Sequence, residues 1–463
     1  MPVSEPPATR ATPHEEGEFR PAGGAGIRRA SFLERLARCG SPRAFALGLG
    51  GAALVVFVGL ALLASGAPFQ HDAGTYHQGA LNILSGRGYV HDRWPWTGCR
   101  AFFPVGYPAF LAGVYALAGP EPLAALAANG VLVAVTVVLS YGLARRLVGE
   151  ALGRMAALAF ALLATTMRMS QTEHSEPLFM VLLYASLLLA CGRRTLGRAA
   201  LAGVPLGLAS LVRVTALPAP ALFLVIFALL GETWRRAAAR ALVLGAAALC
   251  VVAPWTLRNA RVLGHFVPVS TNGGYNLWVG NRPDATGGFG FPHVPADVQA
   301  SNDEVERDRL LARHAMDSIR ASPRLFVARV PARLLYALGF GFCHWGAKYW
   351  ESRATVLARL ALSVLAALLV AVTAFAGARA ACRLIRQRSL ESGPSLVPLV
   401  VLLFLMGFIA ISHGQRRFLY PAYPFMAISL VETVAWGIQR LTRRPGPPGA
   451  RFPRSEAERC RTQ

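Results

Sequence analysis

Charge is scarce in this sequence, and lysine is almost missing from it. Only 15% of the 463 residues are charged, 24 are acidic, and Lys348 is the only lysine. Hydrophobic residues make up 54% of the chain, and the mean hydropathy is +0.42. This balance excludes a soluble globular protein and predicts an integral membrane protein. The use of arginine in place of lysine is typical of a GC-rich, bacterial genome.

The formal net charge of +23 does not predict nucleic-acid binding. The arginines stand in short connectors beside apolar runs, which is how membrane-orienting charges are distributed, and they form no binding stripe. We therefore expect the membrane, and no nucleic acid, as the partner of these charges.

The two ends of the chain contain little that a core could bury. Residues 1–43 are rich in proline, glycine, alanine and charge, which predicts a disordered basic cytoplasmic tail, and we expect 439–463 to form a cytoplasmic tail as well. The first apolar run, at about 44–65, begins too far from the start for a cleavable signal peptide. It follows a group of arginines, so we predict a signal anchor with a cytoplasmic N-terminus.

Ten more apolar runs follow, and most approach the length of a membrane span. Connectors rich in arginine alternate along the chain with connectors that contain fewer arginines only if one of these runs does not cross the membrane. The run at 102–119, with Pro104 and Pro108, is the weakest, so we predict a helix in the outer interface there. We predict an all-α polytopic bundle of ten spans, within a range of 10–12 transmembrane helices, with outer juxtamembrane helices and both termini inside. The runs lie at 102–119, 122–144, 152–168, 177–193, 199–213, 216–231, 238–257, 354–377, 395–411 and 418–438.

The basic connectors define the side predicted to face the cytoplasm. On the outer side we expect segments 66–101 and 258–353, which belong with the spans to one domain, 44–438. The stretch DEVERDRLLARHAMDSIRASP predicts an amphipathic helix that ends before Pro323, and RLFVARVPARLLYALGFGFCHW predicts one along the membrane surface. The cytoplasmic arginines are Arg145, Arg146, Arg154, Arg193, Arg194, Arg198, Arg235, Arg236, Arg240, Arg379, Arg383, Arg386 and Arg388.

Two cysteines, Cys99 and Cys343, fall in the expected outer segments. They either form a disulfide or remain two thiols, because sequence spacing does not fix the geometry that a bridge requires.

Asp72 is the first candidate for a functional residue. It follows the first span and precedes Tyr76 by four residues, so a helix would place both on one face. An acid near hydrocarbon is costly, and this favours a functional role. The alternative is a hydrated loop carboxylate that caps the next helix.

A second acidic cluster lies in the connector TEHSE. Glu173, His174 and Glu176 are suited to binding a divalent cation, orienting a hydroxyl or transferring a proton, and Asp72 would complete a metal site with Glu173 and His174. The spacing matches no standard zinc motif. The alternative is a hydrated loop in which Glu176 caps a helix ahead of Pro177.

Arginines supply the third group of candidates. In HGQRRFLYPAYP, Arg416 and Arg417 suit a phosphate group because a guanidinium presents a planar fork to phosphate oxygens, and Tyr420 lies beside them. Arg213 is a similar candidate. The alternative is anchoring to lipid headgroups with a belt of aromatic residues.

The order and spacing of these motifs resemble the bacterial branch of the dolichyl-phosphate-mannose–protein mannosyltransferase-like family, which includes the aminoarabinose transferase and other type C glycosyltransferases. The resemblance covers about 44–438. It rests on HDAGTYHQGALNILSGRGY, FFPVGYPAFLAGVYALAG, SEPLF, GLASLVRVTAL, APWTLRNARVLGHFVPVSTNGGYNLWVGN and RRFLYPAYP.

The resemblance implies a glycosyltransferase of the bacterial inner membrane that uses a polyprenyl-phosphate sugar and acts on its periplasmic or outer side. Asp72 matches the family's first-loop acid, the general base for the acceptor hydroxyl. Ala73 stands where protein mannosyltransferases have a glutamate, which weakens the case for a protein acceptor against a lipid or glycan. Single displacement would invert the anomeric carbon. Asn276, Trp278 and Asn281 are expected contacts for sugar or acceptor.

Two other classes of function remain open at this stage. A flippase for lipid-linked sugars or a small-molecule transporter would place ionisable residues at mid-span depth, whereas here they gather at the outer ends. The other class is a scaffold for envelope assembly without catalytic activity.

Overall fold

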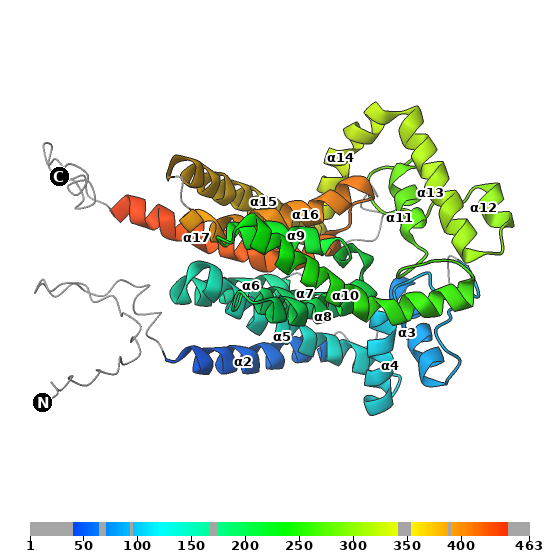
Figure 1. Cartoon of the computed structure of the whole chain (residues 1–463), viewed down its shortest axis with the longest axis horizontal. Coiled ribbons are helices and arrows are strands. Elements are labelled where there is room, and N and C mark those ends of the chain that lie inside the picture. The colour runs from blue at the N-terminus through cyan, green and yellow to red at the C-terminus, as the bar shows by residue number, and fades with distance from the viewer. Residues whose placement is uncertain are drawn as a thin grey trace, which may run out of the picture.

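The computed structural model describes residues 40–63, 71–92, 96–166, 174–340, 353–387 and 390–442, and within these ranges it is helical (Figure 1). Two isolated bridges, His91 to Cys99 and Gly288 to Gly414, are the β-type pairings of the described residues. The predicted all-α class is therefore confirmed. The α-helices are α2 (Pro42–Leu63), α3 (His71–Leu84), α4 (Gly106–Ala118), α5 (Pro122–Val148), α6 (Glu150–Thr166), α7 (Glu176–Ala190), α8 (Leu196–Val212), α9 (Ala219–Leu229), α10 (Trp234–Leu263), α11 (Gly273–Asn281), α12 (Ala296–Ala300), α13 (Glu304–Ala321), α14 (Pro323–Leu338), α15 (Arg353–Gln387), α16 (Val397–Ile411) and α17 (Tyr423–Thr442).

The basic connectors gather at one end of the bundle. Arg154 at the start of α6 donates to the Gly40 carbonyl before α2 at 2.9 Å. Arg240 at the start of α10 donates to the Ala190 carbonyl at the end of α7 at 2.7 Å. The end of α17 lies at this same end, away from α11 to α13 (Figure 1). The predicted alternation of connectors between two ends agrees with these contacts, and the compartment that each end faces stays a prediction.

Within the described ranges, six helices are long and apolar enough to cross a membrane by length and composition. These helices are α2, which is the first predicted span, and α5, α10, α15, α16 and α17, each of which contains another predicted span. The other four predicted spans form α6, α7, α8 and α9, which have 17, 15, 17 and 11 residues. The count of ten spans therefore stays a prediction. The run at 102–119 forms the 13-residue α4, which is also a short apolar helix, so its predicted place in the outer interface stays a prediction.

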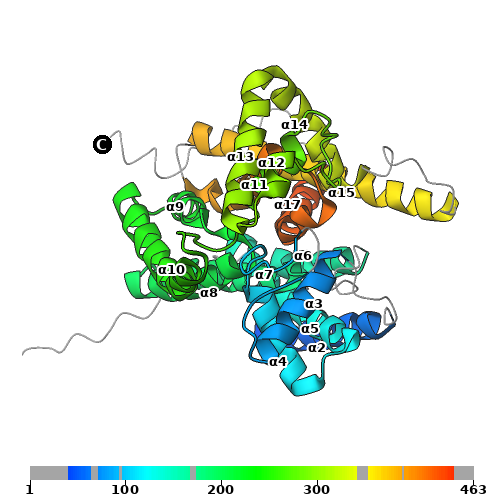
Figure 2. The same ribbon diagram turned by 90° about the vertical axis from the view of Figure 1, so that its right-hand side faces the viewer.

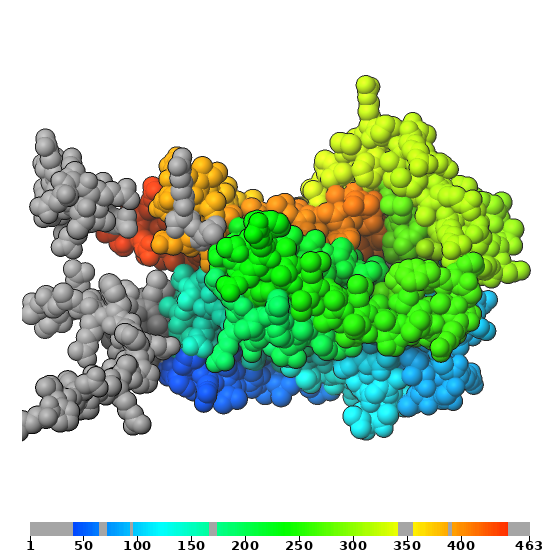
Figure 3. Space-filling view, in the orientation of Figure 1, coloured from blue at the N-terminus to red at the C-terminus, as the bar shows by residue number. Residues whose placement is uncertain are grey.

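The outer helices form a lobe at the end of the bundle opposite the basic connectors (Figures 1 and 3). Turning the molecule shows α11 to α14 on one side of this end and α3 with α4 on the other (Figure 2). An apolar cluster joins the two sides, because Phe102, which directly follows the predicted first outer segment, packs with Tyr275 of α11 and Leu311 of α13. α10 continues to Leu263, six residues beyond the predicted span at 238–257, and the predicted start of the second outer segment at 258 stays a prediction.

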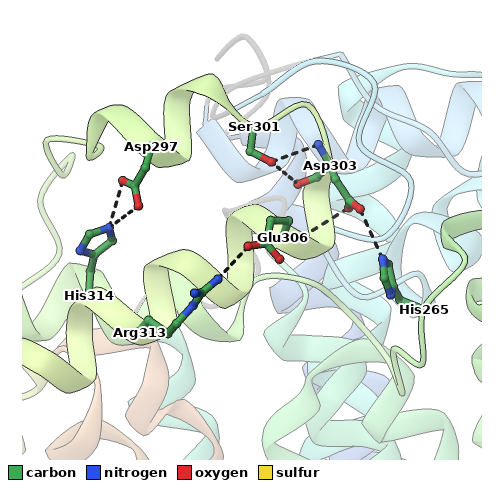
Figure 4. A network of polar contacts seen from close by, with 7 residues as sticks. All are labelled: His265, Asp297, Ser301, Asp303, Glu306, Arg313 and His314. Carbon is green, nitrogen blue, oxygen red and sulfur yellow. Dashed lines mark hydrogen bonds and ion pairs between the residues drawn. The ribbon is translucent and has the colours of Figure 1, made fainter.

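The amphipathic helix expected before Pro323 is α13, and exposed ion pairs tie it to its surroundings (Figure 4). His314 pairs with Asp297 of α12 at 2.9 Å, and Asp303 pairs with His265 at 3.4 Å. Asp303 also caps α13, since its carboxylate accepts from the Val305 amide at 2.7 Å. Exposed pairs of this kind contribute little stability, so the apolar cluster beneath them holds the lobe.

α14 differs from the surface helix that its arginines predicted. Arg333 is fully buried, and it donates to the Gly280 carbonyl at 2.9 Å and to Asn281 Oδ1 at 2.8 Å. It also bonds the Ala410 carbonyl near the end of α16. The expectation of a helix along the membrane surface therefore does not hold at Arg333, which joins the outer lobe to the bundle.

Gly207 permits the close packing of α8 against α10, and its replacement provides a test of the bundle. An added Cβ would lie 2.6 Å from the Ala248 carbonyl oxygen. We expect Gly207→Ala to lower the free energy of unfolding by about 1–3 kcal/mol, because backbone atoms cannot move aside cheaply. Gly197→Ala on the same helix is the matched control, since a Cβ there meets nothing within 4 Å. Thermal unfolding in detergent would contradict this packing if both variants melted at the same temperature.

Candidate functional site

A cavity of about 400 Å³ opens where α3, α7, α8, α11 and α16 meet at the outer end of the bundle. Its walls differ in character. Asp72, Arg213 and Arg417 supply the charged side, while α16 supplies an apolar wall with Phe408 and Ile409. An occupant of this cavity would therefore carry both a charged and an apolar part.

Four charged side chains form a chain of ion pairs beside the cavity. Arg417 Nη2 donates to Asp72 Oδ2 at 2.6 Å, and Arg417 Nε lies 3.6 Å from Glu176 Oε1. Arg213 Nη1 donates to the same Glu176 oxygen at 2.7 Å. Glu176 is buried, with 1% of its side chain exposed, so the two guanidiniums supply the charge that it needs there.

Helix ends position these groups. Asp72 lies in the first turn of α3, and Glu176 is the first residue of α7, so both carboxylates benefit from the positive ends of helix dipoles. Arg213 directly follows the last residue of α8 and precedes a short 3₁₀ turn, and its own backbone is extended. Arg417 lies in the 3₁₀ segment η5 (Arg416–Ala422). Residues far apart in sequence thus meet because α3 and α7 begin, α8 ends and η5 lies beside the same cavity.

Tyr76 and His174 surround the charged cluster. Tyr76 lines the cavity four residues after Asp72, and burial raises its pKa, with a further rise from the charge of Asp72. Burial lowers the pKa of His174, and the nearby Arg417 lowers it further, so its imidazole is neutral at pH 7. Asp72, Tyr76, His174 and Glu176 therefore share one site, as the sequence predicted.

The predicted metal site is only partly within the described residues. Glu173 lies outside them. Among the residues that the structure describes, no three His, Cys, Asp or Glu side chains are grouped as metal ligands. Cys343 is also outside the described ranges, so the alternatives for Cys99 stay open. Cys99 itself is buried, and burial raises the pKa of its thiol to about 12.

The expected pairing of Arg416 with Arg417 is wrong. A 3₁₀ helix turns about 120° per residue, so neighbouring side chains diverge. Arg417 points to Asp72, whereas Arg416 donates to the Ser363 hydroxyl of α15 at 3.0 Å and does not line the cavity. The second guanidinium at the cavity is Arg213, which the sequence offered as a similar candidate.

The residues expected to contact the sugar likewise divide into one that lines the cavity and two that do not. Asn276 lines the cavity from α11. Asn281 does not, because its side chain bonds the Ile411 carbonyl at 2.9 Å and Arg333. Trp278 is also turned away, with its indole donating to the His293 carbonyl at 3.0 Å. The structure thus gives Asn281 and Trp278 packing roles. Tyr420 likewise lies outside the lining, with its ring 6.0 Å from that of Tyr423.

The cavity also contains residues that sequence reasoning did not select. His413 lies between the rings of Phe289 and Phe418, with centroids 5.5 and 5.3 Å away. Burial lowers the pKa of His413 to about 3, and Arg417 adds to the effect, so this imidazole is neutral. Gln415 accepts from Arg417 Nε at 2.7 Å. Both residues belong to the HGQRRF motif, which was the one signal that pointed to them.

The α11 wall of the cavity is held from the outer lobe by Asp308. Its carboxylate accepts from the Gly274 amide at 2.6 Å and from the Tyr275 amide at 3.3 Å. Burial raises the pKa of Asp308 to about 6, although these two bonds favour the charged form. Because the native pKa lies above the ordinary value of 3.8, the stability from this group is complete below about pH 4 and is lost as pH rises through 6.

Asp308→Asn tests this anchor. The amide oxygen can still accept from α11, and we expect the variant to gain up to about 3 kcal/mol over the wild type between pH 4 and 7, because no buried group has to ionise. The measurement is thermal unfolding in detergent across that range. Asp317→Asn, an exposed acid on the same helix, is the control. Parallel pH profiles for wild type and Asp308→Asn would contradict the assignment.

Comparison with known proteins places the fold. Residues 103–257 match the family model described as dolichyl-phosphate-mannose-protein mannosyltransferase, which confirms the resemblance expected from the motifs over a third of the chain. No curated protein sequence matches the chain.

Solved membrane glycosyltransferases share the architecture. The archaeal oligosaccharyltransferase AglB from Archaeoglobus fulgidus, in complex with an inhibitory peptide and a dolichol-phosphate, aligns with a TM-score of 0.52 at 14% identity, over 87% of this chain and 53% of that one. The same organism's enzyme tethered to an acceptor peptide with the NVT sequon gives 0.50 at 15%, over 87% and 51%. This chain thus spans about half their length, and they show its fold.

ArnT from Cupriavidus metallidurans bound to undecaprenyl phosphate aligns with a TM-score of 0.41 at 15% identity, over 88% of this chain and 82% of that one. This score is too low to establish a shared fold.

Proposed function

We propose that this protein, whose residues 103–257 match the mannosyltransferase family model and whose fold is that of membrane glycosyltransferases, transfers a sugar from a polyprenyl-phosphate carrier to an acceptor hydroxyl. The observation that carries the proposal is the chain of ion pairs from Asp72 through Arg417 and Glu176 to Arg213, beside an apolar-walled cavity. A phosphate bearing a lipid on one side and a sugar on the other suits such a cavity.

Asp72 is the proposed general base. Its contact with Arg417 uses Oδ2, which leaves Oδ1 to take the proton of the acceptor hydroxyl. The hydroxyl oxygen forms a bond to the anomeric carbon as the bond from that carbon to the phosphate oxygen breaks. The electron pair leaves with the phosphate, and a single displacement inverts the anomeric carbon.

Arg213 and Arg417 are the proposed partners of the departing phosphate. Both line the cavity, and both rest on the ring of Phe418, 5.3 and 5.9 Å from its centroid. As the anomeric bond breaks, negative charge grows on the phosphate oxygens, and fixed guanidiniums stabilise that charge. Glu176 keeps the two cations in place, and together with Asp72 it balances their charge before the donor arrives.

The apolar wall gives the lipid carrier a place beside the phosphate. Leu405, Phe408 and Ile409 of α16 line it, and α16 is one of the six helices that qualify as membrane spans. The sugar and acceptor would then lie toward α11, near Asn276 and the neutral His413. With this arrangement we propose a bacterial inner-membrane enzyme whose cavity faces the periplasm and whose acceptor is a lipid, glycan or protein.

Asp72→Asn tests the general base. The amide cannot accept the hydroxyl proton at useful strength, so we expect sugar transfer to fall by at least about 10²-fold. The measurement is glycolipid and glycoprotein profiling of a deletion strain complemented with each variant. Glu121→Gln, an exposed acid at the N-cap of α5, is the control and should restore the modification fully. Full restoration by Asp72→Asn would remove this carboxylate from the mechanism.

Arg213→Gln and Arg416→Gln test which of the two arginines binds the phosphate together with Arg417. We expect Arg213→Gln to weaken binding of undecaprenyl phosphate by about tenfold or more, because a charge-assisted bond is lost. Arg416→Gln should change it by less than about twofold, since that side chain lies outside the cavity. Native mass spectrometry with a titrated lipid gives both affinities. The reverse order would restore the adjacent arginine pair as the phosphate site.

A further inference from the structure

A second polar cluster lies at the opposite end of the bundle, where α15 and α17 end (Figure 1). It comprises Arg379 and Arg383 of α15 with Glu432, Trp436 and Arg440 of α17. α15 has 35 residues and is about 52 Å long, whereas about 20 residues cross the hydrocarbon. Its last turns therefore extend to the depth of the lipid headgroups or beyond, far from the cavity described above.

Trp436 joins the two helices in this cluster. The Arg379 guanidinium lies 4.5 Å from the centroid of the Trp436 ring, and that of Arg440 lies 4.9 Å from it. Arg379 also contacts the ring of Phe375, 5.9 Å away. These contacts hold two cations close to the same aromatic side chain, which fixes their positions but satisfies none of their hydrogen-bond donors.

The cluster has more buried donors than acceptors. Nε and Nη1 of Arg379 and Nε of Arg383 are buried and have no hydrogen-bond partner among the described residues. The charges of Arg383, Arg440 and Glu432 all act on Arg379. Glu432 accepts from the Ser395 hydroxyl with one oxygen at 2.7 Å, and its other oxygen, Oε2, is buried without a hydrogen-bond partner among the described residues. Three unpartnered guanidinium nitrogens therefore exceed one unpartnered carboxylate oxygen, and the cluster of three guanidiniums and one carboxylate carries an excess of two positive charges.

Charges that only orient a membrane protein need no such arrangement, because they lie in water and bond to it. Buried guanidinium donors without acceptors are costly, and an anion with several oxygens removes that cost. A phosphate group fits the planar fork of arginine and the net charge of the cluster.

We propose that Arg379, Arg383 and Arg440 form a binding site for a phosphate group at the end of the bundle opposite the sugar-transfer cavity. The ligand is the phosphate of an anionic phospholipid headgroup or a free phosphate. Its occupation ties the end of α15 to α17 and so stabilises the bundle. The site is independent of the proposed transfer reaction.

The test measures the melting temperature of the full-length protein in a non-ionic detergent, titrated with short-chain phosphatidylglycerol or with inorganic phosphate at constant ionic strength. For the wild type we expect a saturable rise. Arg379→Gln/Arg383→Gln should need at least about tenfold more ligand for the same rise, because two charge-assisted donors are lost. If that variant does not fold, Arg383→Gln alone serves, with a smaller loss in the same direction.

Arg235→Gln/Arg236→Gln is the matched control, since it removes the same charge from an exposed site at the same end. It should respond as the wild type does. A response to phosphatidylglycerol alone identifies a lipid headgroup, and an equal response to inorganic phosphate identifies free phosphate. The proposal is overturned by a wild type without a saturable response, by an unchanged Arg379→Gln/Arg383→Gln, or by an equal loss in the control. Undecaprenyl phosphate binding in Arg213→Gln reports on the cavity separately.

Discussion

Charge compensation around a buried carboxylate is the constraint on which the site depends. Glu176 lies at the start of α7 with almost no exposure, and an ionised carboxylate at that depth needs cations within bonding distance. Arg213 reaches it from the end of α8 and Arg417 from η5, and Arg417 then extends to Asp72. One buried acid thereby fixes where three helices and a 3₁₀ segment end relative to one another.

The outer lobe acts on this site through backbone contacts. Asp308 holds the amides at the start of α11, and Arg333 holds the carbonyl of Gly280 near its end. Arg333 also reaches α16, which supplies the apolar wall. The cavity is thus bounded on one side by membrane helices and on the other by a short helix clamped at both ends, which suits a reaction between a lipid-borne and a water-borne substrate.

The sequence predicted the helical class, the grouping of basic connectors and the meeting of Asp72 with His174 and Glu176, because hydrophobic runs and arginine placement follow directly from the membrane. It failed on Arg416 and Asn281 for a local reason. Adjacent residues in a 3₁₀ turn diverge, and a polar residue in a short helix can turn inward to satisfy backbone carbonyls. The hydrophobic pattern also did not predict the length of α9, because the start of that helix depends on the turn after Arg213.

The ring of Phe418 lies within 6 Å of both guanidiniums at the cavity. One rigid aromatic ring thus contacts both guanidiniums that reach the same Glu176 oxygen, and it does so without any hydrogen bond of its own. The placement of the two cations therefore does not depend on hydrogen-bond geometry alone, and it would survive small shifts of the helices that carry them.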